Sequence, residues 1–319
     1  MTYPTVTIIM ATYNRANFIV ESLLSIQKQT FLDWECLIID DGGTDNTKEV
    51  VESFIEKDNR FKFYLRTNDY LKGLPGSRNY GLDIAKGDFI IFFDDDDIPH
   101  PQNLQICVSE LSNNNDIYFC RYVRNVFFEG FHYDFDLSKD YTHFYINDKD
   151  ILQMLNNELQ FNSCAVMWKK ICFKKHRFVE TLMYAEEWEL YSRIVSAGYH
   201  GISIDKCLFY GRKHLRSNTG EFYSNNPIRR ASYVDAIILV VQNLKQKQLL
   251  TYSLKRYFIA TAIDYEEYNL FDGILYVLDL PKFEKVKWRV FYAILPFRLK
   301  IHWLKKVVKN KIGNLELKK

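Results

Sequence analysis

The feature that most constrains the fold is an apolar run, Phe89 to Phe93, followed at once by four aspartates, Asp94 to Asp97. Five consecutive apolar residues are typical of a strand buried on both faces of a sheet. Four like charges at a strand end repel one another, and they favour proton uptake or cation binding. Ligands of open α/β sheets bind outside the carboxyl ends of the strands. The segment therefore predicts a buried strand whose end holds Mg2+ or Mn2+, ions that prefer carboxylate oxygens; the alternative is an acidic, solvated turn.

Strand-like and helix-like patterns alternate over roughly residues 1–125. Alternation with short links predicts parallel strands joined by right-handed crossovers. We therefore expect an α/β protein with a mostly parallel sheet flanked by helices. Strands are predicted at residues 5–10, 34–39, 61–65, 89–93 and 116–121, and helices at residues 16–29, 46–57, 75–86 and 101–111.

The pattern loosens beyond this region. Residues 122–150 are aromatic and acidic without clear periodicity, which predicts an irregular excursion. One more strand is predicted at 161–169, and helices at 186–197, 227–250, 252–272 and 281–310, the last broken near Pro296. We expect a first domain over residues 1–220 and a C-terminal helical region over residues 221–319.

Charge is distributed unevenly along the chain. The net charge is +2, but residues 281–319 hold twelve Lys or Arg against two Glu, a net charge of +10 that leaves −8 for residues 1–280. The six cysteines form no CxxC pair, which argues against a zinc site or a disulfide framework and favours a reducing, cytoplasmic setting. No signal-peptide pattern precedes the first strand, and no apolar run approaches the roughly 18 residues of a membrane span.

Polar side chains follow three of the predicted strands. Thr12, Tyr13 and Arg15 end the first, Asp40 and Asp41 the second, and the four aspartates the fourth. Neighbouring parallel strands would bring these ends together into a nucleotide pocket. Tyr13 would stack on a base, Asp41 would accept a base N–H, and a metal would hold the diphosphate. Strand-end packing and simple turn chemistry are the alternatives for Tyr13 and the Asp40–Asp41 pair.

Arg78 lies near the start of a predicted helix, where a cation can contact a phosphate; a solvated helix Arg is the alternative. Two competing phosphate-binding motifs are missing from the sequence. There is no GxxxxGK[ST], and no GxGxxG follows the first strand. Their absence argues against a P-loop enzyme and against a dehydrogenase.

Taken together, the motifs TYNR (12–15), DDGGTDNT (40–47), GSRNYGLDIAKGDFIIFFDDDD (76–97) and AEEWELYSR (185–193) resemble glycosyltransferase family 2. The resemblance covers about residues 4–215. It implies a GT-A fold with a Rossmann-like nucleotide-binding half. It also implies transfer of a sugar, with inversion, from a nucleotide-sugar donor, a UDP-sugar being the first expectation. The C-terminal helices would be an extension of this fold.

The family's functional positions fall on matching residues of this chain. Tyr13 and Asp41 take the base-recognition positions, and the D-x-D motif falls on residues 94–96. The resemblance makes Asp96 the principal ligand of Mn2+ or Mg2+. It places Asp94 or Asp95 toward the ribose or a metal-bound water, with Asp94 as a second metal ligand. Asp95 is an extra acid relative to the family's common D-S-D-D.

The family's general base is usually the Asp of a Glu-Asp pair at the start of a helix. Here the matching pair is Glu186-Glu187, so the resemblance gives Glu187 the role of base. Glu is one methylene longer than Asp, which can change where the acceptor hydroxyl lies. One base suffices for an inverting transfer, because a metal can neutralise the leaving diphosphate. The alternative is that both carboxylates only stabilise the positive end of a helix dipole.

Residues 210–217 resemble a segment that closes over the diphosphate in related enzymes. Arg212, His214 and Arg216 are therefore expected to contact phosphate or metal, and a basic surface loop is the alternative. Residues 282–311 combine aromatic and aliphatic residues with ten Lys or Arg, a pattern that favours contact with an anionic membrane surface. A helix packed on the protein with a solvated basic face is the alternative; nucleic-acid binding would use the same charge but is not expected.

We therefore predict a metal-dependent, inverting glycosyltransferase that acts on a saccharide or lipid-linked acceptor in the synthesis of a cell-surface polysaccharide or lipid-linked oligosaccharide. It would work in the cytoplasm, peripherally at the inner face of the cell membrane. A sugar-nucleotidyltransferase is one alternative, although such enzymes carry a glycine-rich, basic signature where this chain has residues 12–15, TYNR. A non-catalytic, membrane-associated nucleotide-sugar-binding protein is the other, and the retained acidic clusters argue against it.

Overall fold

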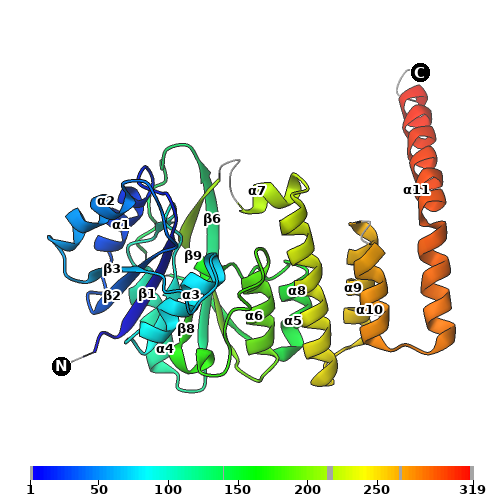
Figure 1. Cartoon of the computed structure of the whole chain (residues 1–319). Coiled ribbons are helices and arrows are strands. Elements are labelled where there is room, and N and C mark those ends of the chain that lie inside the picture. Colours follow the sequence, from blue (N-terminus) through cyan, green and yellow to red (C-terminus); the bar gives the residue numbers. More distant parts are fainter. Residues whose placement is uncertain (1–2, 139, 214–217, 266–267, 317–319) are drawn as a thin grey trace. The chain divides into compact units, whose positions relative to one another are not determined.

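The computed structural model describes residues 3–138, 140–213, 218–265 and 268–316. The chain forms two compact units, Met1–Ser253 and Leu254–Lys319. Figure 1 shows the elements of both units. Helices α7 (Asn218–Tyr223) and α8 (Pro227–Gln246) belong to the first unit, and α8 packs against α6 (Glu186–Val195). The predicted boundary at residue 220, between a first domain and a C-terminal helical region, stays a prediction.

The first half of the sheet is parallel, as predicted. Its strands are ordered β3 (Phe61–Leu65), β2 (Trp34–Asp40), β1 (Val6–Thr12) and β4 (Phe89–Phe92). Every residue of β2 and β4 is buried, because helices cover both faces of the central strands. In the register of β1 with β2, Thr12 pairs with Asp40. The polar residues that follow these two strands are therefore neighbours.

The second half of the sheet is mixed. It continues from β4 through β8 (Val166–Lys169), β6 (Phe119–Phe128), β9 (Gly201–Lys213) and β5 (Ile98–Pro99), and β7 (His143–Ile146) pairs with β9. Only β6 and β9 run parallel here. The prediction of an irregular excursion over 122–150 is wrong for two segments of that range: β6 extends to Phe128, and residues 143–146 form β7. Pairing along the long β9 gives these residues a strand conformation that their own pattern does not specify.

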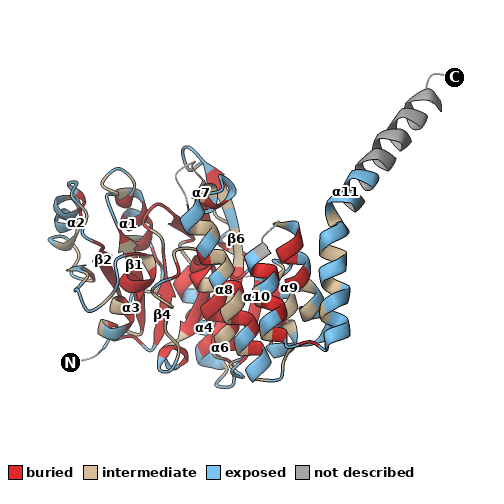
Figure 2. Ribbon diagram, turned by 45° about the vertical axis from the view of Figure 1, so that its right-hand side comes forward, coloured by how far each residue is buried: buried red, intermediate tan, exposed pale blue. Residues whose placement is uncertain are grey.

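The helices of the first unit cover this sheet and hold the core. Besides α6 to α8 they are α1 (Ile19–Gln27), α2 (Thr47–Ile55), α3 (Leu74–Ile84), α4 (Asn103–Asn113) and the short α5 (Ile151–Leu155), with 3-10 turns at Asp148–Asp150, Ser163–Ala165 and Lys170–Phe173. Figure 2 shows the buried residues concentrated in the strands and on the inner helix faces. Helix α3 approaches β1 closely at Gly81, where a Cβ atom would lie 2.5 Å from Ile9. This close packing fixes the position of Arg78, three residues earlier on α3.

The second unit is helical. It contains α9 (Tyr252–Asp264), α10 (Tyr268–Leu278) and α11 (Lys282–Glu316). The single helix predicted over 252–272 is thus two helices. The predicted break near Pro296 is also wrong, because α11 continues through this residue. In the described parts of the chain, no helix has the length and apolarity needed to cross a bilayer.

Candidate active site

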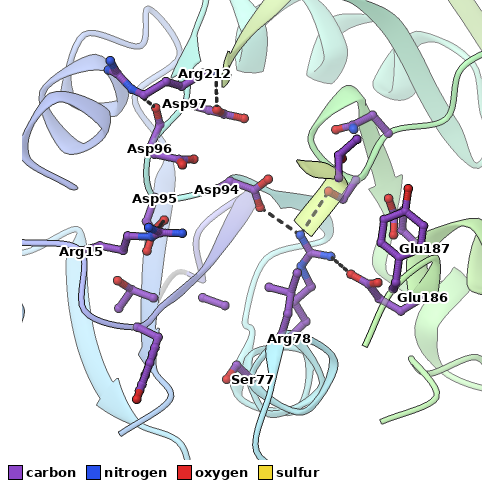
Figure 3. Close-up of a pocket in the computed structure, with 18 of the residues that line it drawn as sticks. Arg15, Ser77, Arg78, Asp94, Asp95, Asp96, Asp97, Glu186, Glu187 and Arg212 are labelled. Atoms are coloured by element: carbon purple, nitrogen blue, oxygen red, sulfur yellow. Dashed lines mark hydrogen bonds and ion pairs between the residues drawn. The ribbon is translucent and has the colours of Figure 1, made fainter. Parts of the chain in front are cut away.

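A cavity of about 510 Å³ opens at the carboxyl ends of β1, β2 and β4 (Figure 3). It brings together most residues that the sequence singles out. Those that line it are Thr12, Tyr13, Arg15, Asp41, Arg78, Asp94, Asp95, Asp96, Glu187 and Arg212. Asp40 lies at the end of β2 beside this cavity without lining it. The edge of the sheet predicted from the strand ends is therefore hollowed and polar.

Tyr13 lines the cavity and is exposed. Its ring is 46% exposed, and Lys72 Nζ lies 4.7 Å from the ring centre. The next residue, Asn14, has a left-handed backbone (φ 54°), and its side-chain oxygen accepts hydrogen bonds from the N–H groups of Thr44 (2.7 Å) and Asp45 (3.2 Å). These bonds tie the loop after β1 to the loop after β2. An exposed aromatic face is thereby held beside Asp41.

Asp40 and Asp41 have different roles. Both carboxylate oxygens of Asp40 accept from the Gly43 N–H at 3.1 Å, so this side chain fixes the turn after β2. Asp41 instead lines the cavity, and its Oδ1 accepts from Arg66 Nε at 2.5 Å and from Ser77 Oγ at 3.3 Å. A carboxylate oriented in this way is an acceptor for an N–H group of a ligand. The turn-chemistry alternative applies to Asp40 and not to Asp41.

We call Asp94, Asp95, Asp96 and Asp97 the acidic quartet. Three arginines partly balance its charge: Arg78 Nη2 lies 3.0 Å from Asp94, Arg15 Nε 3.4 Å from Asp95, and Arg124 Nη2 3.6 Å from Asp97. Asp97 is buried and also accepts from the backbone N–H of Arg212 at 2.7 Å. Asp94 is half-buried, with 37% of its side chain exposed. The quartet is therefore held at the cavity by fixed cationic partners rather than solvated as a turn.

Burial, and then charge repulsion within the acidic quartet, raise two of its pKa values. Burial, and then the charge of Asp96, raise the pKa of Asp95 to about 7, although Arg15 opposes this. Burial, and then the charges of Asp94 and Asp96, raise the pKa of Asp97 well above its usual value. The described arginines thus do not offset the cost of burying these carboxylates in their charged form. Such a site gains stability by binding either protons or a cation.

Among the described residues, one three-residue group has metal-ligand spacing. Oxygen atoms of Asp94 and Asp97 and the sulfur of Cys164 lie within 4.8 Å of one another. Burial raises the pKa of the Cys164 thiol well above its usual value, and the charges of Asp94 and Asp97 raise it further. Cys164 therefore stays a neutral thiol, and the carboxylates are the donors that suit a hard cation. Asp96 is not in this group, and its role as principal ligand stays a prediction.

Arg78 connects the two acidic parts of the site. Its side chain is 2% exposed and lies over the rings of Phe92 and Phe178, each 5.5 Å from the guanidinium. Nη2 donates to Asp94 (3.0 Å) and to Ser163 Oγ (3.1 Å), and Nη1 donates to Glu186 (3.3 Å). Figure 3 shows the guanidinium between the two carboxylates. The alternative of a solvated helix Arg is wrong, and phosphate contact stays a prediction.

We call Glu186 and Glu187 the glutamate pair. They open α6, where the helix dipole favours negative charge, and the preceding Ala185 has a left-handed backbone (φ 62°). Glu186 is buried and bonded to Arg78, whereas Glu187 is partly exposed and lines the cavity. Burial and the charge of Glu186 raise the pKa of Glu187 to about 8. A carboxyl group with this pKa, facing a cavity, can accept a proton near neutral pH.

Arg212 makes its side-chain contacts with the protein. Its guanidinium donates to the carbonyl oxygens of Asp96 (3.0 Å) and Glu129 (2.5 Å), pairs with Glu21, and lies 4.5 Å from the ring centre of Phe127. The predicted contact of Arg212 with a diphosphate stays a prediction. His214 and Arg216 lie outside the described residues.

Several residues of the site were not predicted. Arg66 follows β3, Arg124 lies on β6, and Ser163 precedes β8; each contacts a predicted site residue. Tyr184 and Arg229 line the cavity near Glu187. For Arg66 the signal was available, because it follows a strand next to β2. The others come from segments whose position depends on the mixed half of the sheet.

A family model described as "Glycosyl transferase family 2" matches residues 7–173. A curated relative, the UDP-Glc:alpha-D-GlcNAc-diphosphoundecaprenol beta-1,3-glucosyltransferase WfgD of Escherichia coli, is 44% identical over 110 residues. The matched stretch is 34% of this chain and 42% of the relative, so the likeness spans less than half of that protein.

Solved structures extend the likeness to most of the chain. TarS 1-349 of S. aureus, in complex with UDP-GlcNAc, has a TM-score of 0.63 at 21% identity, covering 85% of this chain and 79% of that one. The mannosyltransferase PcManGT of Pyrobaculum calidifontis, in complex with GDP-Man and Mn2+, has a TM-score of 0.53 at 16% identity, covering 92% and 84%. These likenesses show the fold, which is the predicted GT-A arrangement with C-terminal helices. With the family model matching more than half of its residues, this chain belongs to glycosyltransferase family 2.

Proposed function

We propose that this protein transfers a sugar from a nucleotide-sugar donor to an acceptor hydroxyl, with inversion and with the help of Mn2+ or Mg2+. The observation that carries the proposal is the arrangement of one cavity. It is lined by the exposed residue Tyr13 and the carboxylate of Asp41, by the acidic quartet, and by Glu187. A base site, a cation site and a general base are the three parts that such a transfer needs.

For the donor we propose a UDP-sugar. Tyr13 would stack on the base, and Asp41, oriented by Arg66, would accept a base N–H. Thr12 and Arg15 also line the cavity, with Arg15 beside Asp95, and we place the ribose and the diphosphate of the donor next to them. The TarS and WfgD names, which include UDP-GlcNAc and UDP-Glc, support uridine as the nucleoside.

The residues of the acidic quartet fit a divalent cation. The fit rests on the crowded carboxylates, whose raised pKa values show incomplete charge compensation, and on the spacing of the Asp94 and Asp97 oxygens. We propose that Asp94 and Asp96 hold the ion, with Asp97 anchoring the segment through the Arg212 N–H. When bound, Mn2+ or Mg2+ would neutralise the charge of the leaving diphosphate. The complex of PcManGT with Mn2+ supports the choice of metal.

Glu187 would act as the general base. It would take the proton from the acceptor hydroxyl as that oxygen attacks the anomeric carbon and the bond to the diphosphate breaks. Arg78 holds Glu186 at 3.3 Å, which keeps the glutamate pair oriented toward the cavity. Burial, and then the charge of Glu186, keep the pKa of Glu187 high, and a high pKa makes the carboxylate a stronger base.

We propose a lipid-linked saccharide as the acceptor. The name of the WfgD relative includes a diphosphoundecaprenol acceptor, which supports this choice. Such an acceptor requires the enzyme to work at a membrane, and we propose the cytoplasmic face, with peripheral contact through residues 282–311. The product would be a lipid-linked oligosaccharide or a cell-surface polysaccharide.

The test is calorimetric titration with UDP and with GDP, each with and without Mn2+, followed by turnover of a set of UDP-sugars. We expect UDP to bind at least tenfold more tightly with Mn2+ than without it. The release of UDP from one sugar nucleotide should rise when a lipid-linked acceptor is added. Nucleotide binding that is absent, or unchanged by metal, contradicts the proposal.

A further inference from the structure

Helix α11 has two apolar faces. On one face, Tyr292 stacks on Phe271 of α10, with ring centres 4.3 Å apart and planes 12° apart. Trp288 and Leu295 on the same side are partly buried. This face is the one that holds α11 against α10 within the second unit. An ordinary surface helix has only one such apolar stripe.

The second apolar face of α11 is exposed. It consists of residues spaced three or four apart, which places them on one side of the helix. Val290 precedes Tyr292 by two residues, or about 200° of rotation, so this side is opposite the packed one. We call these residues the outer stripe: Phe283 (81% exposed), Val286 (58%), Val290 (53%), Ile294 (45%), Phe297 (69%) and Ile301 (38%).

Basic residues flank the outer stripe on both sides. Lys282, Arg289 and Lys300 each precede a stripe residue by one position, which places them about 100° to one side of it. Lys287 follows Val286 by one position and lies on the other side. All four are exposed, and among the described side chains of α11 the one acid is Glu284. The sequence that follows continues the charge with Lys305, Lys306, Lys309 and Lys311.

We infer that the outer stripe of α11 inserts into the surface of an anionic membrane, with the helix lying in the plane of the interface. An apolar stripe bordered by Lys and Arg matches acyl chains bordered by anionic headgroups, since the long basic side chains reach outward while their stems remain in the apolar layer. A second protein copy would offer the same basic border, and like charges would then face each other. Charge complementarity therefore selects the lipid.

The inference rests on the proposed function only in that a lipid-linked acceptor gives the enzyme a reason to bind a membrane. Vesicle binding itself requires neither nucleotide nor catalysis. Cosedimentation of the full chain with phosphatidylcholine vesicles, with and without phosphatidylglycerol, measures it directly. We expect strong binding to the anionic vesicles that weakens as salt is added, because exposed charges are screened.

The decisive variant is Val290→Asp with Phe297→Asp. Both side chains are exposed in the protein, so the fold should tolerate the change. Loss of two apolar groups that would insert into the membrane should weaken vesicle binding about tenfold or more. The matched control is Tyr252→Asp with Tyr276→Asp, which adds the same charge at two exposed aromatic residues (70% and 85%) off the stripe. A second variant, K282Q with K287Q and K300Q, should weaken binding to anionic vesicles by roughly a hundredfold at low salt.

The inference is overturned if the wild-type chain ignores anionic vesicles, or if the stripe variant binds them as tightly as its control. It is also overturned if the stripe variant turns a dimer into a monomer in analytical ultracentrifugation while vesicle binding is unchanged, because the stripe would then bind a second copy. Transfer to a water-soluble acceptor should be equal in both variants. Vesicle binding without any such transfer would contradict the proposed function and leave the inference standing.

Discussion

The acidic quartet and the glutamate pair face the same cavity, but their charges are balanced differently. Among the described residues, the acidic quartet pairs with Arg15, Arg78 and Arg124, which come from separate parts of the chain. Within the same described residues, the glutamate pair has one close ion pair, between Glu186 and Arg78, and Arg78 is shared with Asp94. The quartet is a set of oxygens that favours a cation, and Glu187 is a carboxyl group that favours a proton.

This difference shows how one fold can supply two kinds of acid chemistry within a single cavity. The buried guanidinium of Arg78 lies between two carboxylates and pairs with both, Asp94 at 3.0 Å and Glu186 at 3.3 Å. Burial still raises the pKa of Glu186 above its usual value, although the charge of Arg78 opposes this. Burial lowers the pKa of Arg78, but the charges of Asp94 and Glu186 outweigh this effect and raise it overall. For the neighbouring Glu187, burial and then the negative charge of Glu186 raise the pKa to about 8.

The largest expected effect comes from Glu187→Gln. Removing the base should lower kcat about a thousandfold, within the range of general-base contributions, while the affinity for UDP with Mn2+ stays the same. Kinetics with the active sugar nucleotide and calorimetry with UDP measure the two quantities. The control is Glu189→Gln, also in the first turn of α6, whose carboxylate pairs with Arg193 at 2.8 Å. Turnover that survives in Glu187→Gln places the base elsewhere and removes the distinction between the two groups.

A second variant tests the cation side of the comparison. Asp96→Asn should lower kcat/KM about a hundredfold and raise the Mn2+ concentration needed for half-maximal activity, since a neutral amide is a weaker ligand than a carboxylate. A titration of activity with Mn2+ separates the two effects. Asp88→Asn is the control, because Asp88 is exposed and immediately precedes β4, at the end of the strand away from the acidic quartet. An unchanged Mn2+ requirement would assign the ion to the Asp94 and Asp97 oxygens alone.

The sequence specified the acidic quartet well and its partners poorly. An apolar run and the charges after it are contiguous, so their placement at a strand end follows from local pattern. Arg124 reaches Asp97 only because β6 extends to Phe128 alongside β9, and that pairing joins residues about 80 positions apart. The dual contact of Arg78 could not be predicted either, because Glu186 lies 108 residues away. These contacts depend on pairing between residues far apart in the sequence, which local periodicity does not reveal.

The pH dependence of turnover tests the protonation of Glu187, the proton-binding group of the comparison. With the pKa of Glu187 raised to about 8, the fraction of base lacking a proton falls about tenfold per pH unit below that value. At saturating Mn2+ and donor, kcat should therefore rise about tenfold from pH 6 to pH 7 and level off above pH 8. Glu187→Asp should shift this profile, whereas Asp96→Asn should leave its midpoint in place. A rate that is flat between pH 6 and pH 8 would contradict the assignment of the base.

The smallest expected effect is a thermal shift, and its sign separates cation binding from proton binding at the acidic quartet. The pKa of Asp95, ordinarily 3.8, is raised to about 7 in the folded protein, and that of Asp97 is raised as well. The folded state therefore binds more protons than the unfolded state between these values, so stability falls as the pH rises from about 4 toward 7.

A cation bound to the acidic quartet would take the place of these protons. At a hundred times its Kd, Mn2+ would add about 2.7 kcal/mol and raise Tm by roughly 5–10 °C at pH 7.5. At pH 5.5 protons compete with the ion, and the shift should be smaller. Differential scanning calorimetry at both pH values measures the Mn2+-induced shift in Tm. Asp95→Asn should reduce the difference between the shift at pH 5.5 and the shift at pH 7.5. Equal shifts at pH 5.5 and pH 7.5 would mean that the ion binds away from these carboxylates.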